Sequence, residues 1–373
     1  MLTPDQIAGL QVAFQRLTDP VQEFLIKDIA RRVKQAGEFT STAAYQTWRL
    51  QTLGKSLPEV QDELARLMGV AAEDAAALLE QAAEFGYIDD VDRLGGAVKF
   101  SDNPAMRQIV EAAVQLARGD LTNITQTIGF INQDGLSRTL TAAYEQACDF
   151  AFTQVVTGAT DYNTAIRQAC GKLAGAGVQS VSYAQQGGRF INTSLEAAVR
   201  RNLISGTGLM VEKISQQNYN DLGADGWEIS AHGNCAPDHE PIQGKQYTNE
   251  EYQKLNRSLK RRIGTLNCGH TASPIILGVS RQQYSRKELA DFRRENDKGV
   301  TYEGRTFKTM YEATQCQRQI ERSIRAWERR VMTGTYDEAE TRLRLLRAEY
   351  RRFSKAVGLR TENERLFVAG FKT

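Results

Sequence analysis

The sequence lacks long apolar runs, and it has few cysteines and only three histidines. The longest apolar stretch that we find, PIILGV at 274–279, is far too short to cross a bilayer, so we expect no membrane partner. Five cysteines at irregular spacing do not indicate the disulfide framework of a small secreted protein. The opening residues MLTPDQIAGL show no basic stretch before an apolar run, which predicts no signal peptide and synthesis in a reducing cytoplasm.

Charge is balanced over the whole chain but not along it. The net charge is +2, and 373 residues with 41% apolar and 25% charged content are ordinary for a globular protein of two or three domains. Residues 281–373 nevertheless hold 22 Lys and Arg against 14 Asp and Glu, whereas residues 1–280 hold 25 against 31. A basic C-terminal quarter can contact nucleic acid or an acidic partner, or it can simply be the solvated face of charged helices.

Residues 1–103 form a predicted N-terminal helical region. Apolar residues at helical spacing predict a helix over 19–37 that stops at Gly37. Similar patterns, each ending in a glycine that favours a helix stop, recur over 40–54, 56–69 and 71–86. Residues 87–103 lose this period, which predicts a connection.

A central helical region, residues 104–225, is predicted to follow. Longer helical patterns cover 104–119, 136–158, 161–177 and 192–223. Cys148 and Cys170 lie among apolar residues of these segments, and small buried side chains explain them most simply.

The pattern changes again at residue 226. Residues 226–280 combine alternating β-capable residues with glycine and proline, which predicts a small α+β module of short strands and loops. Residues 281–373 return to helical spacing, and helices over 309–334 and 335–358 predict a basic αα-hairpin that turns at Thr333–Thr335. The predicted fold is therefore mainly α and multi-part, with the Cys/His-containing module between the helical regions and a C-terminal charged hairpin.

All three histidines and two of the five cysteines fall in this module. The spacings are Cys235-x3-His239 and Cys268-x-His270, with His232 three residues before Cys235. Zinc prefers thiolate and imidazole ligands, and a loop-rich module with little core gains most from such a metal. The single residue between Cys268 and His270 is unlike the spacing of a zinc finger, so a hydrogen-bonded polar cluster without metal is the alternative.

The same cluster has a catalytic interpretation. Carboxylates at Glu228, Asp238 and Glu240 can act as bases or orient an imidazole, and Cys268 can pair with a histidine as nucleophile and base. The segment carries no recognisable catalytic signature, and the glycine-rich stretches of the chain lack the Lys and Ser/Thr of a phosphate-binding loop. We therefore predict that the protein is not an enzyme, with a metal-dependent hydrolase or nuclease at 232–270 as the alternative.

The first helix of the predicted hairpin is rich in arginine. Acidic residues are interleaved with these arginines, so any DNA contact is expected to be to phosphate and independent of sequence. The candidate residues for such contacts are Arg318, Arg322, Arg325, Arg329 and Arg330.

Four blocks of the sequence, in order along nearly the whole chain, carry a resemblance to a known family. They are FLIKDIARRVKQAGEFTSTAAYQTWRLQTLG (24–54), LEAAVRRNLISGTG with DLGADGWEISAHG (195–208 and 221–233), a histidine block, and YEATQCQRQIERSIR (311–325). The histidine block contains His232, Pro237, His239, QGKQY (243–247), Asn267-Cys268-Gly269-His270 and Pro274. In these residues the chain resembles the phage minor capsid protein 2 family, which is related to the Mu-type head morphogenesis proteins.

One position departs from the pattern of that family. After His232 the family usually carries a Gly-Ala-Arg-like stretch, whereas this chain has GNCA at 233–236. Cys235 therefore does not carry over as a family ligand. If a zinc ion binds, the resemblance implies the ligand set His232, His239, Cys268 and His270, with Cys235 as a substitute.

The resemblance also implies a role. It implies a structural minor capsid protein of a tailed bacteriophage, made in the host cytoplasm and located in the virion, inside the head and near the portal. The implied partners are the portal, the major capsid or scaffolding proteins and, through sequence-independent contacts, the packaged DNA. The implied processes are head assembly and the packaging and ejection of DNA. The residues themselves are compatible with this role, because they predict a mainly helical chain with an arginine-rich hairpin and no strong active site.

Overall fold

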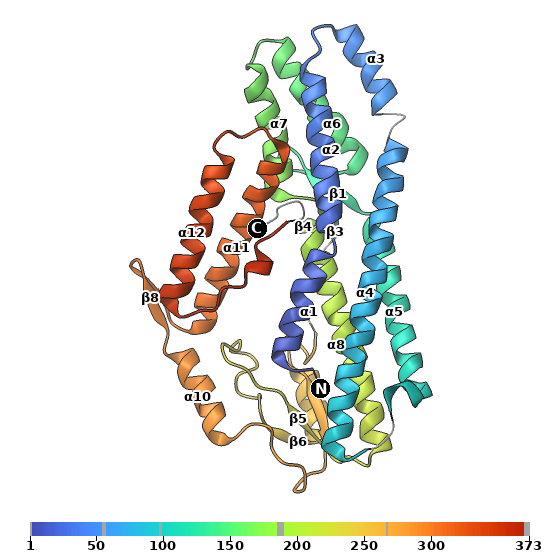
Figure 1. Cartoon of the computed structure of the whole chain (residues 1–373), viewed down its shortest axis with the longest axis vertical. Coiled ribbons are helices and arrows are strands. Elements are labelled where there is room, and N and C mark those ends of the chain that lie inside the picture. Colours follow the sequence, from blue (N-terminus) through green and yellow to red (C-terminus); the bar gives the residue numbers. More distant parts are fainter. Residues whose placement is uncertain (1, 54–56, 97–98, 185–189, 266–267, 369–373) are drawn as a thin grey trace.

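The computed structural model describes residues 2–53, 57–96, 99–184, 190–265 and 268–368 of the chain. Most of these residues are helical, and the longest helices run along the long axis of an elongated molecule (Figure 1). The mainly α, multi-part fold predicted from the sequence is confirmed. Within the ranges given, no helix is long and apolar enough to cross a membrane.

The elements follow one another along the chain in numerical order. The helices are α1 (Pro4–Arg16), α2 (Asp19–Gly37), α3 (Thr42–Thr52), α4 (Leu57–Leu94), η1 (Phe100–Asp102), α5 (Pro104–Thr125), α6 (Leu140–Val156), α7 (Tyr162–Ala176), α8 (Leu195–Asp221), α9 (Asn249–Ser258), α10 (Arg286–Asp297), α11 (Met310–Thr333), α12 (Ala339–Val357) and η2 (Asn363–Arg365). The strands are β1 (Ile128–Ile131), β2 (Ser137–Thr139), β3 (Gln179–Ala184), β4 (Phe190–Ser194), β5 (Gly226–Ile229), β6 (Gln246–Thr248), β7 (Ala272–Ile275), β8 (Val300–Tyr302) and β9 (Arg305–Phe307).

The long helix α4 passes through two glycines that were predicted to end helices. Gly69 and Gly86 lie inside it, and it continues to Leu94, well into the connection predicted over 87–103. Glycine inside a helix costs only about 1 kcal/mol relative to alanine. The helix buries a row of apolar side chains against α5 and α8. These predictions are wrong because tertiary packing outweighs the local preference of glycine.

The N-terminal and central helical regions share one hydrophobic core. In the lower half of Figure 1, α1 packs with α8, and α4 packs with α5 and α8. In the upper half, α2 packs with α6 and α7. The buried apolar side chains form one cluster that extends from Leu2 to Ile214. The predicted boundary at 103 therefore separates two stretches of sequence but not two cores.

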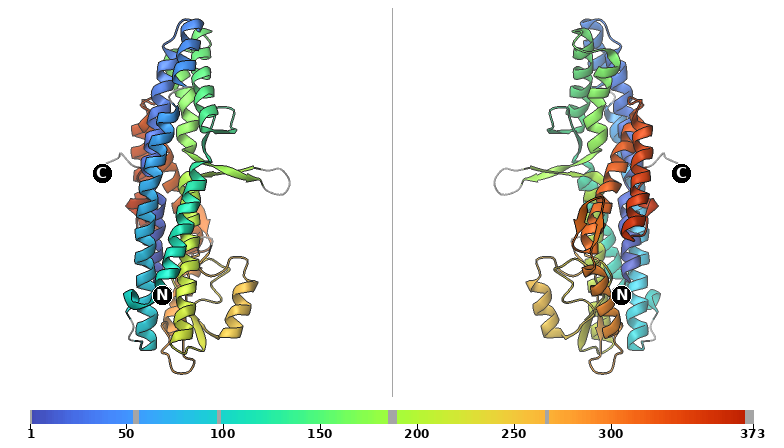
Figure 2. Two further views of the ribbon diagram at one scale, coloured as in Figure 1. Left: turned by 90° about the vertical axis from the view of Figure 1, so that its right-hand side faces the viewer. Right: turned by 90° about the vertical axis from the view of Figure 1, so that its left-hand side faces the viewer.

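A small antiparallel sheet of order β2-β1-β3-β4 lies near the middle of the helical body (Figure 1). Residues 137–139 belong to its strand β2, although a helix was predicted over 136–158. A Cβ at Gly129 of β1 would lie 1.9 Å from the carbonyl oxygen of Arg138, so only glycine allows these strands to pair this closely. Strands β3 and β4 extend away from the helices as a hairpin (Figure 2).

The predicted C-terminal αα-hairpin is confirmed. Helices α11 and α12 pack against one another and turn after Thr333 at Gly334, whose φ of 57° is a left-handed conformation that glycine adopts easily. Helix α11 also packs against α2 and α7, so the hairpin lies along one side of the helical body (Figure 1). Helix α10 and the two-stranded sheet β8-β9 precede it.

Candidate metal centre

The predicted small module contains a three-stranded antiparallel sheet of order β6-β5-β7 with α9 beside it. Trp227 of β5 stacks between Tyr219 of α8 and Tyr252 of α9, with ring centroids 5.2 and 5.1 Å away. Helix α9 begins with a capping box in which Thr248 and Glu251 exchange hydrogen bonds. The stacked rings give the module its small core and join it to the helical body.

Two loops carry the Cys/His residues. The first, residues 230–245, leaves β5 and returns beside it, and it is closed by backbone hydrogen bonds of Ile229 with Gly244 and Lys245. Gly244 has a φ of 67°, and a Cβ there would lie 2.3 Å from the side chain of Leu289, which explains the glycine of the QGKQY block. This loop holds His232, Cys235 and His239, and the loop before β7 holds Cys268 and His270.

His239 is buried, and its two ring nitrogens have different partners. Nε2 lies 2.7 Å from the carbonyl oxygen of Arg261, which can only accept a hydrogen bond, so Nε2 carries the proton. Nδ1 therefore has the lone pair, and it lies 3.2 Å from Cys268 Sγ. A backbone carbonyl thus fixes the tautomer of His239, as outer partners do for histidines that bind metals.

Gln243 fixes the tautomer of His270 in the same way. The Oε1 atom of Gln243 accepts from the backbone N–H of His232 at 3.1 Å, and the same oxygen lies 3.2 Å from His270 Nε2. His270 Nε2 is therefore the donor, and Nδ1, which has the lone pair, lies 3.6 Å from Cys268 Sγ. No sequence pattern singles out Gln243 for this role, because a glutamine beside a metal-type cluster has no spacing rule of its own.

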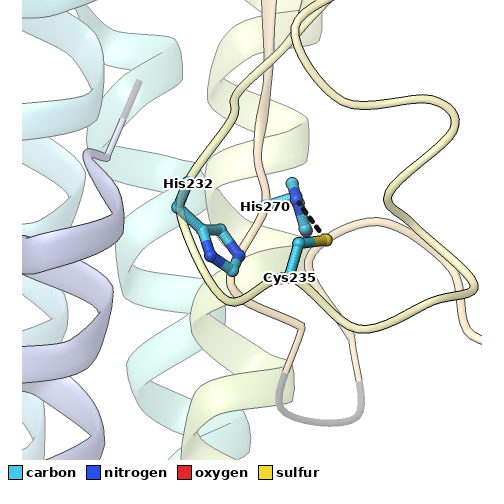
Figure 3. A group of neighbouring side chains, drawn as sticks. All are labelled: His232, Cys235 and His270. Carbon is cyan, nitrogen blue, oxygen red and sulfur yellow. Dashed lines mark hydrogen bonds between the residues drawn. The ribbon is translucent and has the colours of Figure 1, made fainter. Parts of the chain in front are cut away.

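Cys235 and His232 lie near the Nε2 side of the His270 ring (Figure 3). Cys235 Sγ is 3.5 Å from His270 Nε2, and its thiol donates to the carbonyl of Ala236 at 3.3 Å. The ring of His232 lies 4.4 Å from the ring of His270, between centroids, and His232 Nδ1 donates to the carbonyl of Gly233 at 2.8 Å. His232 and Cys235 thus form a second group around the same central imidazole.

Burial favours the neutral forms of all five side chains. It lowers the pKa of His270 to about 2, with a further contribution from the neighbouring His232 and His239. It also lowers the pKa of His232 and of His239. The same burial raises the pKa of Cys235 to about 12 and raises the pKa of Cys268. Neutral imidazoles keep a lone pair available, and a metal ion would bind the cysteines as thiolates with release of a proton.

All five residues that the sequence singled out come together, in two groups of three that share His270. One group is His232, Cys235 and His270, the other is His239, Cys268 and His270, and the ligand atoms of each lie within 4.8 Å of one another. The four-residue set implied by the family resemblance is divided between the two groups. Metal binding by any of these residues stays a prediction, and Asn267 of the same block lies outside the described residues.

The carboxylates considered for catalysis have structural partners. Glu228 is fully buried and accepts a hydrogen bond from a side chain of the neighbouring strand β6. Asp238 pairs with Arg261 at 2.6 Å, and Glu240 accepts from Asn296 at 3.3 Å. These contacts hold the loops in place and add nothing in favour of catalysis.

Two of the five arginines predicted to contact DNA are buried. Arg325 and Arg329 are 1% and 5% exposed, and both lie beside Glu196 of α8. Arg329 also donates to the carbonyl oxygens of Ala174 and Gly175 at 3.0 and 3.1 Å. Side chains held in this way cannot reach a phosphate backbone, so the structure contradicts the predicted DNA role for these two residues.

The exposed basic side chains of the hairpin lie mainly on α12. Of the remaining arginines of α11, only Arg322 is exposed, whereas Arg318 and Arg330 are half-buried. Arg318 pairs with Glu321 at 2.7 Å, and Arg330 lies over the ring of Trp327. The exposed basic residues of α12 are Arg342, Arg344, Arg351, Arg352 and Lys355. The charge count predicted a basic hairpin, but the side of each helix that faces the solvent depends on packing partners elsewhere in the chain.

Comparison with known proteins identifies a family. A family model described as phage minor capsid protein 2 matches residues 2–354. No curated protein and no solved structure matches the chain significantly. The matched range includes the whole helical body, the module with both loops of the cluster, α11 and most of α12.

Proposed function

Because the chain belongs to the phage minor capsid protein 2 family, we propose that it is a structural protein that lies inside the phage head near the portal. The observation that carries this proposal is the family match over residues 2–354, which also confirms the family predicted from the sequence. Membership implies a component of the virion that contacts other head proteins. The proposed partners are the portal and the major capsid or scaffolding proteins, during head assembly and DNA packaging or ejection.

The form of the molecule supports a role in contacts between proteins. The helical body is long and narrow, and the β3–β4 hairpin projects from it, so the chain presents a large surface for its mass (Figures 1 and 2). The apolar side chains of Leu116 on α5 and Leu209 on α8 are 68% and 42% exposed and line the same hollow. Neighbouring apolar side chains in contact with solvent are typical of surfaces that bind other proteins.

The exposed basic residues of α12 support contact with packaged DNA. Because such contacts would be to phosphate, binding should weaken steeply as salt rises. In fluorescence-anisotropy titrations on duplex DNA, Arg351→Gln with Arg352→Gln should reduce the slope of log affinity against log salt by up to about 2. The control pair, Arg293→Gln with Arg294→Gln on the exposed face of α10, should leave that slope unchanged. Affinity that does not respond to salt would contradict this part of the proposal.

A metal-dependent hydrolase or nuclease is not favoured. His239, Cys268 and His270 are 0%, 3% and 2% exposed, so a substrate has little access to their ligand atoms. The family is named for a structural component of the head. A structural role is therefore the better proposal.

Purified phage particles test the location. Mass spectrometry of virions purified on a density gradient should detect this chain at a far lower copy number than the major capsid protein. Chemical cross-linking of intact particles should join it to the portal protein. Absence of the chain from particles, or cross-links confined to tail proteins, would contradict the proposal.

A further inference from the structure

Cys268 lies between two imidazole nitrogens that both have lone pairs. His239 Nδ1 and His270 Nδ1 lie 3.2 and 3.6 Å from its Sγ, and the far nitrogen of each ring already donates to an oxygen. One thiol proton can satisfy only one of the two lone pairs. All three side chains are buried, so the second lone pair has no donor in this cluster. A buried surplus of acceptors of this kind favours a bound cation.

The distances around Cys268 suit zinc. Bonds of about 2.3 Å to sulfur and about 2.0–2.1 Å to nitrogen, at a tetrahedral angle, place sulfur and nitrogen about 3.6 Å apart. The two measured separations, 3.2 and 3.6 Å, are close to this value. Thiolate and imidazole are also the ligand types that zinc prefers over magnesium or calcium. We propose that His239 Nδ1, Cys268 Sγ and His270 Nδ1 bind one Zn²⁺ ion.

The second group around His270 is less suited to the metal. It would have to use His270 Nε2, which donates its proton to Gln243 Oε1. Its thiol, Cys235, already has an acceptor in the carbonyl of Ala236. Cys235 is as buried as Cys268 and lies in the same cluster, so the two cysteines form a matched pair for experiment.

The zinc ion would act at the place where the module meets the helical body. Thr271, next to His270, donates to the carbonyl of Leu2 at 3.1 Å. Gly264, in the loop before Cys268, is in backbone contact with Gly208 of α8. By joining the two loops, the ion would hold Gly264 against α8 and Thr271 against Leu2. This structural role is independent of where the protein lies in the phage.

Metal content of the full chain tests the assignment. The wild-type protein, produced with added zinc and purified without a metal column, should contain about one zinc per chain by inductively coupled plasma mass spectrometry. Cys268→Ser should lose most of this zinc, whereas Cys235→Ser should keep it. A wild-type protein without zinc would overturn the proposal, and so would a Cys235→Ser variant that loses zinc while Cys268→Ser retains it.

Cobalt substitution gives a readout that does not depend on whether Cys268→Ser folds. Co²⁺ bound to the wild-type chain should show the intense visible bands of a tetrahedral site and a thiolate-to-cobalt charge-transfer band. Cys235→Ser should retain both features. A weak octahedral spectrum without the charge-transfer band in the wild-type protein would overturn the proposal.

Discussion

Arg325 of α11 and Asp19 of α2 are 306 residues apart in the sequence, yet Arg325 Nη2 donates to Asp19 Oδ1 at 2.8 Å. The same nitrogen donates to Glu196 Oε2 of α8 at 2.5 Å, and Arg325 Nε donates to that oxygen at 3.0 Å. Nη1 reaches the backbone carbonyl of Phe367. Because Arg325 is almost completely buried, one guanidinium joins the C-terminal hairpin to two helices of the body.

Removal of this cation should strongly destabilise the protein. We expect Arg325→Met to lower the free energy of unfolding by about 3–5 kcal/mol, because two carboxylates would remain in the interior without their main partner. Urea unfolding followed by far-ultraviolet circular dichroism measures the change. Arg322→Met, on the exposed side of the same helix, is the control and should change the free energy by less than about 0.5 kcal/mol. Equal effects of the two substitutions would show that the buried contacts contribute nothing.

The two carboxylates should give this cluster opposite pH dependences. Burial raises the pKa of Glu196, but Arg325 and Arg329 outweigh it and hold that pKa at about 2, below the usual 4.5. The stabilisation from Glu196 is therefore present above pH 4.5 and is lost as the pH falls towards 2. At Asp19 burial prevails over Arg325 and raises the pKa to about 6 from 3.8, so its contribution is favourable at low pH and is lost as the pH rises through 6.

Single amide variants separate these contributions. The difference in unfolding free energy between wild type and Glu196→Gln should shrink as the pH falls from 4.5 towards 2. The unfolding free energy of wild type relative to Asp19→Asn should fall in the other window, as the pH rises from 3.8 to 6. Urea titrations at pH steps through both windows provide the curves. Two differences that stay constant with pH would show that neither carboxyl changes its pKa on folding.

The arginines of α11 show why only part of the fold could be predicted. The helix and its turn at Gly334 depend on residues within a few positions, and the sequence pattern predicts both. The inward direction of Arg325 depends on Asp19 and Glu196, which come from distant segments. Local spacing contains no information about those partners, so buried and exposed arginines looked alike.

The cluster shows the same division between local and distant causes. The composition of 232–270 was enough to select its five Cys and His residues, because these residue types are rare in the chain. The direction of each lone pair depends on the carbonyl of Arg261 and the amide of Gln243. A backbone carbonyl leaves no trace in the residue sequence, so the grouping around Cys268 becomes visible only in the structure.

The contact between Gly208 of α8 and Gly264, in the loop before β7, should not tolerate a side chain at Gly208. A Cβ at Gly208 would lie 1.8 Å from the carbonyl oxygen of Gly264, a backbone atom that can move only if the loop moves. We expect Gly208→Ala to destabilise the protein by about 1–3 kcal/mol. Gly206, two positions away on the opposite side of α8, has open space at its Cβ, so Gly206→Ala should stabilise by up to about 1 kcal/mol through helix propensity. Thermal unfolding of both variants gives the sign, and a stabilised Gly208→Ala variant would contradict the close approach.

A buried aspartate forms another connection between the module and the body. Asp90 of α4 is fully buried, and it accepts from Ser215 of α8 at 2.6 Å and from Ser273 of β7 at 3.1 Å. Because Asp90 and Ser273 are in direct hydrogen-bond contact in the interior, Asp90→Ala and Ser273→Ala should be non-additive, with a coupling free energy of about 1–3 kcal/mol in a double-mutant cycle. The control cycle combines Asp90→Ala with Ser354→Ala, because Ser354 is a buried serine of the distant hairpin. This cycle should be additive within about 0.5 kcal/mol. Additivity in both cycles would mean that Asp90 stabilises α4 and α8 without joining them to the module.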